Sequence, residues 1–258
     1  MSLIEINGLV FEYADGIRIL DDIKLSIEAG TTTTVIGLNG CGKTTLIKLI
    51  AGLMKPTLGE ITVNGRSVLS MSDHDRSKLI AYVPQFISNY IPFTVIDYLA
   101  LSLTNQKSIY WQPNSEDRAL VEDFANRMNI DGTILGRRVD ELSGGERQIV
   151  MICGALMQDA KIVILDEPTS TLDMKNQFVV LNFLKHCYNT EKKTIILSSH
   201  DPNHALRLGG KVVALHKGKF ILSGESHEII CAERLKGIYG EFICNSRESK
   251  YNYVILER

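Results

Sequence analysis

The order of apolar and polar positions predicts a chain that alternates between strands and helices. Apolar or β-branched runs predict strands at residues 31–36, 79–83, 162–165 and 194–197. The last two are solid enough for strands buried on both faces, and residues 174–186 between them carry a helical pattern. Because neighbouring parallel strands need such a crossover, the pattern favours an α/β fold with a mostly parallel sheet.

Turn signals predict antiparallel strand pairs in addition to this sheet. Pairs of turn residues separate apolar segments at Asn7-Gly8, Asp15-Gly16, Asn64-Gly65 and Lys217-Gly218. The first two predict antiparallel strands near the N-terminus. The third follows an alternating segment at residues 60–63 and predicts a hairpin. The fourth predicts the turn of a closing hairpin over residues 211–223.

From about residue 94 to residue 158 the pattern changes to that of helices. Ser115 is in the position of an N-cap. Behind it, one helical face collects the apolar side chains of Leu120, Val121, Phe124, Ala125 and Met128. A second apolar face consists of Ile149, Ile152, Cys153 and Leu156. The segment therefore predicts a helical subdomain inserted into the α/β fold.

Composition narrows the class of protein. The 258 residues carry a net charge of −2 and are 45% hydrophobic, so the total charge predicts neither a nucleic-acid-binding protein nor a polybasic membrane anchor. The five cysteines show no paired spacing, which favours reduced thiols. No charged region precedes an apolar signal segment, and the longest apolar run, at residues 149–157, is short of a membrane span. We expect a peripheral subunit if the protein works at a membrane.

Residues 37–45 fit the phosphate-binding pattern G-x-x-x-x-G-K-[ST], between a predicted strand and a predicted helix. Glycines allow backbone N–H groups to surround anionic oxygens, and the helix N-terminus adds a partial positive charge. Lys43 would reach the β- and γ-phosphates, and the Thr44 hydroxyl would hold Mg²⁺. The predicted nucleotide contacts in this loop are Asn39, Gly40, Cys41, Gly42, Lys43, Thr44 and Thr45.

Two carboxylates follow the strand predicted at residues 162–165. An acid at this position lies at the carboxyl edge of a parallel sheet, where open α/β sheets bind ligands. Asp166 would contact Mg²⁺ through water, and Glu167 could orient or deprotonate the attacking water. The alternative is that both acids merely form a polar exit from the strand.

Residues 142–146, Leu-Ser-Gly-Gly-Glu, open the helix of the second apolar face. They predict either a second anion-binding helix N-terminus or a flexible glycine-containing turn with Ser143 as an ordinary N-cap. Together with the phosphate-binding loop, this segment resembles the ATP-binding-cassette (ABC) ATPases, whose signature reads LSGG(E/Q). The resemblance extends from Tyr13 to the residues numbered in the 220s, with the motifs in family order.

The resemblance implies roles for several further residues. Tyr13 matches the aromatic residue that stacks on adenine, and Gln85 matches the Q-loop, which reaches Mg²⁺ and water. Asp173 belongs to a segment that matches the D-loop. His200 matches the switch histidine that contacts the γ-phosphate, whereas His204 is expected to be an ordinary solvated or core histidine.

The resemblance also implies a two-fold homodimer. In this arrangement Ser143, Gly144 and Gly145 of one subunit close over ATP that is held by the other. ATP binding would close the dimer, and hydrolysis with phosphate loss would open it.

The implied fold is a P-loop NTPase (RecA-like) core with a mostly parallel sheet, an N-terminal antiparallel β-subdomain and an inserted α-helical subdomain. The expected parts are residues 1–87, 88–160 and 161–258 of one ABC ATPase domain. The helical part, together with the Gln85 loop, would form a groove for a membrane permease. Val95, Ile96, Tyr98 and Leu99 are candidates for lining that groove, although plain core packing explains them equally well.

The sequence segments at residues 77–85, 172–177 and 200–205 are similar to those of importer ATPases for metal chelates, namely iron–siderophore, haem and cobalamin. They predict an ATP-hydrolysing subunit at the cytoplasmic face of the membrane. Its partners would be permease subunits and, indirectly, a substrate-binding protein, with no nucleic acid. The alternatives are a soluble assembly factor, a transporter ATPase for another cargo, and a catalytically inactive nucleotide-gated module. Gly154 departs from the family pattern, where Arg is frequent.

Overall fold

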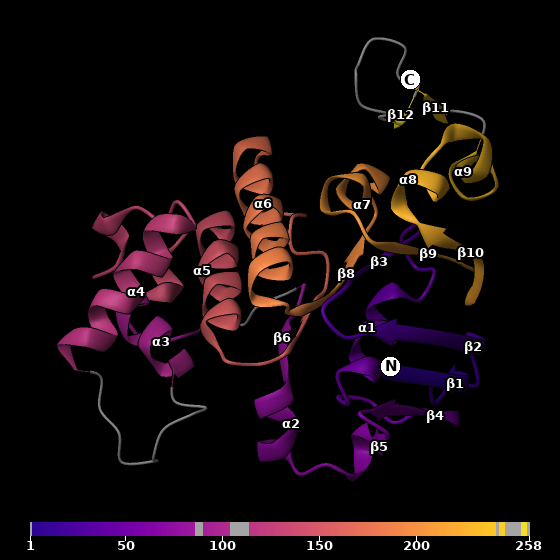
Figure 1. Ribbon diagram of the computed structural model, residues 1–258, viewed down its shortest axis with the longest axis horizontal. Helices are drawn as coiled ribbons and strands as arrows, with labels where there is room; N and C mark the ends of the chain where they lie inside the picture. The colour runs from indigo at the N-terminus through magenta and orange to yellow at the C-terminus, as the bar shows by residue number, and fades with distance from the viewer. Residues whose placement is uncertain (1, 86–89, 104–113, 241–242, 246–253, 257–258) are drawn as a thin grey trace.

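The structure is a computed structural model that describes residues 2–85, 90–103, 114–240, 243–245 and 254–256. A central sheet separates a group of helices from an antiparallel sheet, which lie on opposite sides in Figure 1. The boundary predicted between residues 87 and 88 falls outside the described residues.

The central sheet has the strand order β10-β9-β3-β8-β7-β6. Its strands are β3 (Thr32–Ile36), β6 (Ile80–Val83), β7 (Ile162–Leu165), β8 (Thr194–Ser199), β9 (Lys211–His216) and β10 (Lys219–Glu225). All neighbours are parallel except β9 and β10, which form the predicted closing hairpin. The predicted parallel sheet is therefore confirmed, and its antiparallel strand lies at one edge.

Strand β7 shows why these runs are apolar on both faces. Ile162 and Ile164 pack into the cluster shared with helix α1 (Lys43–Ile50), whereas Val163 and Leu165 pack into the cluster on the other face. Helices α5 (Gly144–Met157) and α6 (Met174–Glu191) cover that other face. Burial on both sides removes the alternation that a half-exposed strand would show.

The C-terminal part packs around the β9 side of the sheet. Its elements are α7 (Pro202–Leu208), α8 (Ser226–Ile229), α9 (Ala232–Tyr239), β11 (Ile243–Asn245) and β12 (Val254–Leu256). Ile36, Val212 and Ala214 form a buried cluster with Leu235 and Ile238 of α9. Helix α9 is therefore attached to the strand that leads into the phosphate-binding loop.

A separate antiparallel sheet has the order β2-β1-β4-β5. Its strands are β1 (Ser2–Glu12), β2 (Arg18–Glu28), β4 (Leu58–Val63) and β5 (Arg66–Ser67), so the hairpins at Asp15-Gly16 and Asn64-Gly65 are confirmed. The prediction of a turn at Asn7-Gly8 was wrong. Strand β1 runs through this pair, and its register with β2 shifts between Ile6 and Leu9, with Gly8 at φ 58°. A bulge and a turn both favour a residue with positive φ, which explains the error.

The remaining helical elements are α2 (Asp73–Leu79), α3 (Val95–Leu101), α4 (Ser115–Arg127) and the 3₁₀ turns Val68–Ser70, Gly132–Ile134 and Val139–Glu141. The cap of α4 is Asn114 rather than Ser115, because Asn114 and Asp117 form a reciprocal capping box. Val121, Ala125 and Met128 are buried as expected, whereas Leu120 is exposed.

Two of the residues proposed to line a permease groove belong instead to the core. Val95 and Leu99 are fully buried, so their side chains are not available to a partner. Ile96 and Tyr98 are partly buried and pack against the same cluster. Within the described residues, no helix combines the length and the apolar character needed to cross a membrane.

The structure explains the glycine at position 154. A Cβ atom on Gly154 would lie 2.9 Å from Ser102 Oγ and 3.1 Å from a ring carbon of Tyr98. Helix α5 therefore approaches the end of α3 so closely that any side chain would press against it. The glycine lowers the helix propensity of α5, but its lack of a side chain allows α5 and α3 to pack closely.

Two glycine substitutions test this explanation. In α9, a Cβ on Gly237 would meet no atom within 4 Å. Gly237→Ala should therefore raise the free energy of unfolding by about 0.5–1 kcal/mol, because alanine restricts the unfolded chain and favours helix. Gly154→Ala should give no such gain, because the new methyl group crowds Ser102 and Tyr98. Urea unfolding midpoints measure both, and equal stabilisation by the two substitutions would refute the packing explanation.

Candidate functional site

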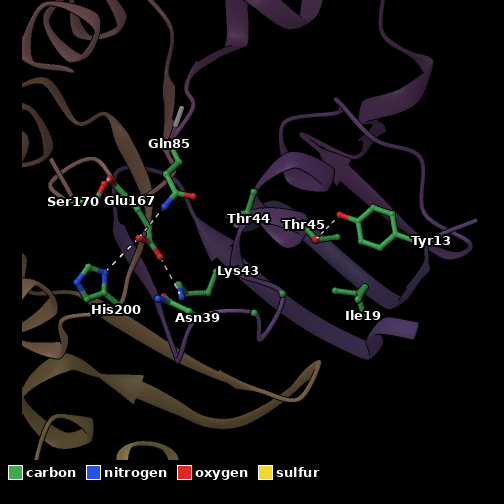
Figure 2. Close-up of a pocket in the computed structure, with 12 residues that line it drawn as sticks. Tyr13, Ile19, Asn39, Lys43, Thr44, Thr45, Gln85, Glu167, Ser170 and His200 are labelled. Atoms are coloured by element: carbon green, nitrogen blue, oxygen red, sulfur yellow. Dashed lines mark hydrogen bonds and ion pairs between the residues drawn. The ribbon is translucent and has the colours of Figure 1, made fainter. Parts of the chain in front are cut away.

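The phosphate-binding loop connects β3 to α1, and its path depends on Gly37. A Cβ atom on Gly37 would lie 2.3 Å from the Leu215 carbonyl oxygen and 2.7 Å from Cys41 Sγ, so no other residue fits. Gly42 precedes α1 with φ 108° and leaves the first turn of the helix facing the pocket in Figure 2. The loop therefore places a helix N-terminus, with its free N–H groups, at the sheet edge.

Lys43 is the first residue of α1 and is buried. Its ammonium group donates hydrogen bonds to the carbonyl oxygens of Gly37 at 2.9 Å and Leu38 at 3.1 Å. It also pairs with the Glu167 carboxylate at 3.3 Å (Figure 2). Two carbonyls and a carboxylate thus hold a cation where a phosphate group of a nucleotide would bind.

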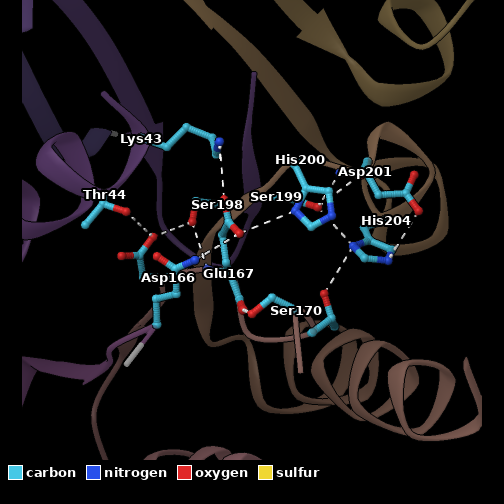
Figure 3. Close-up of polar contacts among 12 residues, drawn as sticks. Lys43, Thr44, Asp166, Glu167, Ser170, Ser198, Ser199, His200, Asp201 and His204 are labelled. Atoms are coloured by element: carbon cyan, nitrogen blue, oxygen red, sulfur yellow. Dashed lines mark hydrogen bonds and ion pairs between the residues drawn. The ribbon is translucent and has the colours of Figure 1, made fainter. Parts of the chain in front are cut away.

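Glu167 follows β7 and has a left-handed backbone, with φ 44°. This conformation is unusual for a residue before a proline and stores strain that functional sites often contain. The Glu167 N–H is fixed by a 2.9 Å hydrogen bond to Ser198 Oγ. Its carboxylate meets Gln85 Nε2 at 3.2 Å (Figure 2) and His200 Nδ1 at 3.3 Å (Figure 3). The strained turn therefore points the carboxylate into the pocket.

Asp166 precedes Glu167 in the chain and is buried. Its Oδ1 accepts hydrogen bonds from Thr44 Oγ1 at 3.1 Å and from Ser198 Oγ at 2.6 Å. Its Oδ2 is also buried and has no hydrogen-bond partner among the described residues. An unpaired buried carboxylate oxygen next to a threonine hydroxyl fits the oxygen ligands that Mg²⁺ prefers. Burial, together with the negative charge of Asp166, raises the pKa of Tyr82 to about 12.

A cavity of about 600 Å³ lies beside these groups. The residues that line it are Tyr13, Ile19, Asn39, Gly40, Gly42, Lys43, Thr44, Thr45, Gln85, Glu167, Ser170 and His200. Tyr13 lies at the end away from Glu167, half-exposed, with its hydroxyl 3.3 Å from Thr45 Oγ1 (Figure 2). Its ring meets Phe11 edge to face, and the exposed part of the ring is accessible to a planar group.

Two lining residues were missing from the predicted contacts. Ile19 lies in β2, and nothing in its alternating apolar pattern distinguishes it from a core residue. Ser170 belongs to the segment that matches the D-loop, where only Asp173 was proposed as a contact.

Six predicted site residues do not line this cavity. Two of them, Cys41 and Asp166, are buried in the phosphate-binding loop and after β7, and the other four lie at the starts of α5 and α6. Ser143 caps α5 by accepting a 3.3 Å hydrogen bond from the Glu146 N–H, while the Glu146 carboxylate accepts one from the Ser143 N–H at 2.8 Å. Gly144 and Gly145 form the first turn of the same helix. Asp173 caps α6 by accepting from the Asn176 N–H at 2.8 Å. Within one chain, the four residues at the starts of α5 and α6 have structural roles and do not line the pocket.

His204 has the structural role expected for it. It is buried, and its Nδ1 lies 2.9 Å from Ser199 Oγ and 3.4 Å from Thr169 Oγ1. Burial lowers its pKa against the opposing effect of Asp201. His204 is therefore a neutral core residue beside the active groups.

The sequence profile of the ABC transporter family matches residues 20–170. The chain belongs to the ABC transporter family. It is 32% identical to the iron(3+)-hydroxamate import ATP-binding protein FhuC of Bacillus subtilis (strain 168), over 97% of this chain and 93% of that protein.

Two solved structures have the same fold as this ABC ATPase. One belongs to a transporter described as metal-chelate type, in an inward-facing conformation, with a TM-score of 0.80, 27% identity and coverage of 99% of this chain and 97% of that one. The other is a dimeric ATP-binding cassette in a post-hydrolysis state with ADP and Pi, with a TM-score of 0.77, 26% identity and coverage of 86% and 98%. The chain is therefore an ATPase with the P-loop NTPase fold.

The buried thiols allow a test of the loop geometry. Burial raises the pKa of Cys41 above its usual value, although the charge of Lys43 opposes the rise. A raised pKa reduces the thiolate fraction at neutral pH and slows alkylation. We expect N-ethylmaleimide at pH 7 to label the more accessible Cys231 before Cys41 and to leave Cys153 and Cys187 unlabelled, because burial raises the pKa of each of these two to about 12.

Peptide mass spectrometry would follow each thiol. Labelling of Cys41 should accelerate as pH rises and should abolish nucleotide binding, because its Sγ is packed under Gly37. Bound ATP should slow the labelling of Cys41 and leave that of Cys231 unchanged. Full ATP affinity after complete modification of Cys41 would contradict this geometry.

Proposed function

We propose that this ABC ATPase powers the import of a metal chelate through a separate membrane permease. The observation that supports ATP hydrolysis most directly is the arrangement at one end of the cavity. Lys43 and His200 both contact Glu167 there. The neighbouring Asp166 accepts a hydrogen bond from Thr44. Tyr13 lies at the other end of the same cavity.

ATP fits this cavity in one orientation. Tyr13 would stack on the adenine ring, a contact worth about 1–3 kcal/mol. The loop from Asn39 to Gly42 and the first residues of α1 would then surround the phosphates, with Lys43 against the β- and γ-phosphates. Thr44, Asp166 and Gln85 would hold Mg²⁺. The bound ion would neutralise charge on the phosphate oxygens.

Hydrolysis requires a water molecule in line with the bond between the γ-phosphorus and the ADP oxygen. The water oxygen would form a bond to the γ-phosphorus while the bond between the γ-phosphorus and the ADP oxygen breaks. Glu167 would accept the proton that the water loses. His200 would contact the γ-phosphate, and its 3.3 Å contact with Glu167 places both groups on the same side of the cavity. A γ-phosphate would also compete with Glu167 for Lys43, which frees the carboxylate for the water.

The signature residues support a two-fold dimer. Ser143, Gly144 and Gly145 lie outside their own chain's cavity, so they would contact ATP only across an interface. In this arrangement two copies of the chain would enclose two ATP molecules. Closure by ATP and opening after hydrolysis would drive the permease between two conformations, because ATP stabilises the closed state.

The proposed import reaction and its cargo are supported by similarity to known transport proteins. The related FhuC is named for import of an iron chelate, and one structural neighbour is described as metal-chelate type. We propose a peripheral position at the cytoplasmic face of the membrane, with permease subunits as direct partners and a substrate-binding protein as an indirect one. The alternatives are a transporter ATPase for another cargo and a soluble assembly factor.

Substitution of Glu167 tests the proposed base. Glu167→Gln should retain ATP binding, lower kcat at least about 100-fold and accumulate an ATP-bound dimer, because the neutral amide cannot accept the proton. ATP turnover, equilibrium binding and gel filtration with ATP measure these effects.

Lys43→Ala is the matched control for this experiment. It should lose ATP affinity and remain monomeric with ATP, because it removes the cation that holds the phosphates. Hydrolysis by Glu167→Gln at the parental rate would show that Glu167 is not the base.

The partner is tested with tagged Glu167→Gln protein and ATP, added to detergent-solubilised membranes of the native host. We expect mass spectrometry of the captured proteins to find a polytopic permease, together with a metal-chelate-binding protein. Lys43→Ala bait should capture less permease, because it does not form the ATP-bound state. Capture of soluble proteins alone, under conditions that preserve such complexes, would favour the assembly-factor alternative.

A further inference from the structure

Tyr239 connects the C-terminal helix to the residue proposed to contact the γ-phosphate. It is the last residue of α9 and is half-buried against the cluster that contains Ile36 and Ala214. Its hydroxyl donates a 3.1 Å hydrogen bond to the backbone carbonyl oxygen of His200. Nothing in the sequence analysis pointed to this tyrosine.

The surroundings of the hydroxyl keep it a donor. Burial raises the pKa of the Tyr239 phenol, and the charge of Asp201 acts in the same direction, whereas the Gly37 backbone opposes the rise. Because burial is the larger effect, the pKa lies above its usual value and the phenol stays protonated at neutral pH. It can therefore act as a hydrogen-bond donor whenever the enzyme is active.

A chain of contacts connects Tyr239 to the reacting end of the cavity. Gly37 accepts from Lys43 at 2.9 Å, and Lys43 pairs with Glu167 at 3.3 Å. Glu167 in turn meets His200 at 3.3 Å. Tyr239 binds the His200 end of this chain of contacts from the side of α9. One hydroxyl thus links α9 to the segment that carries His200.

The position of the His200 ring depends on its backbone. The side chain is 53% exposed, so packing restrains it little. Its peptide lies between the end of β8 and the start of α7. On its flanks, Ser199 Oγ donates to the Asp201 carbonyl oxygen at 3.1 Å and accepts from the Asp201 N–H at 3.0 Å. These bonds fix residues 199 and 201, whereas Tyr239 fixes the carbonyl of residue 200 itself.

We infer that Tyr239 is a positioning residue for ATP hydrolysis, which holds the His200 backbone so that the imidazole meets Glu167 and the γ-phosphate. This inference rests on the proposed role of His200. It gives the C-terminal helix a function in the reaction, because α9 sets the place of the hydroxyl. A displacement of α9 would move His200 without touching the nucleotide.

The test is a double-mutant cycle in the purified full chain, with Tyr239→Phe, His200→Ala and the combination. Tyr239→Phe removes one oxygen and keeps the ring. It should lower kcat about tenfold, the effect of one net hydrogen bond, and leave the dissociation constant for ATP within about twofold. In the His200→Ala background, Tyr239→Phe should have no further effect on kcat.

Tyr188→Phe is the matched control. Tyr188 is a partly buried tyrosine of α6 that packs against a different cluster, the one covered by α5 and α6. Its loss of a hydroxyl should leave kcat unchanged. Melting temperatures of both Phe variants should agree with the parent within about 3 °C, which separates positioning from general destabilisation.

The outcomes separate this inference from the proposed role of His200. If His200→Ala retains the parental kcat, His200 has no such role and the inference fails with it. If His200→Ala is impaired but Tyr239→Phe is not, or if the two effects on kcat multiply, Tyr239 does not act through His200. A weaker ATP affinity at unchanged kcat would assign Tyr239 to the phosphate-binding loop and overturn the inference.

Discussion

The buried contact between Lys43 and Glu167 is the interaction on which the rest of the site depends. Both side chains lie out of water, and removal of either partner from such a pair costs about 3–5 kcal/mol because the other charge stays buried. The two carbonyl oxygens on Lys43, together with Gln85 and His200 on Glu167, complete the hydrogen bonding. A nucleotide phosphate can replace Glu167 beside Lys43 without leaving the ammonium unpaired, so the site is matched to an incoming anion.

The strand order of the central sheet produces this contact. Lys43 comes shortly after β3, Glu167 follows β7 and His200 follows β8, and β8 lies between β3 and β7 in the sheet. Because these strands are parallel, their carboxyl ends meet at one edge, where open α/β sheets bind ligands. Ser198, at the end of β8, then bridges Asp166 and the backbone of Glu167. Residues far apart in sequence thus become hydrogen-bonded neighbours.

Much of this arrangement was predictable because its signals are local. The apolar runs of β7 and β8 and the glycines of the phosphate-binding loop each determine their own short segment. The turn predicted at Asn7-Gly8 was wrong because a bulge within a strand and a turn between strands need the same backbone freedom. Ile19 and Tyr239 could not have been found from sequence, because only the packing of distant elements gives an ordinary apolar or aromatic residue its place. Local pattern therefore predicts elements and loop chemistry, and tertiary contacts add the residues that position them.

The signature segment shows how one sequence can have both a structural and a proposed binding role. The Ser143 hydroxyl accepts from the Glu146 N–H and so caps the first turn of α5. A Cβ on Gly144 would meet no atom within 4 Å, whereas one on Gly145 would lie 3.3 Å from the Thr171 carbonyl oxygen. The first glycine thus leaves the helix N-terminus open, and the second allows the D-loop to pack against it. In the proposed dimer, a phosphate that draws Ser143 toward it would also move the segment at Thr171, and this backbone contact would couple the two nucleotide sites.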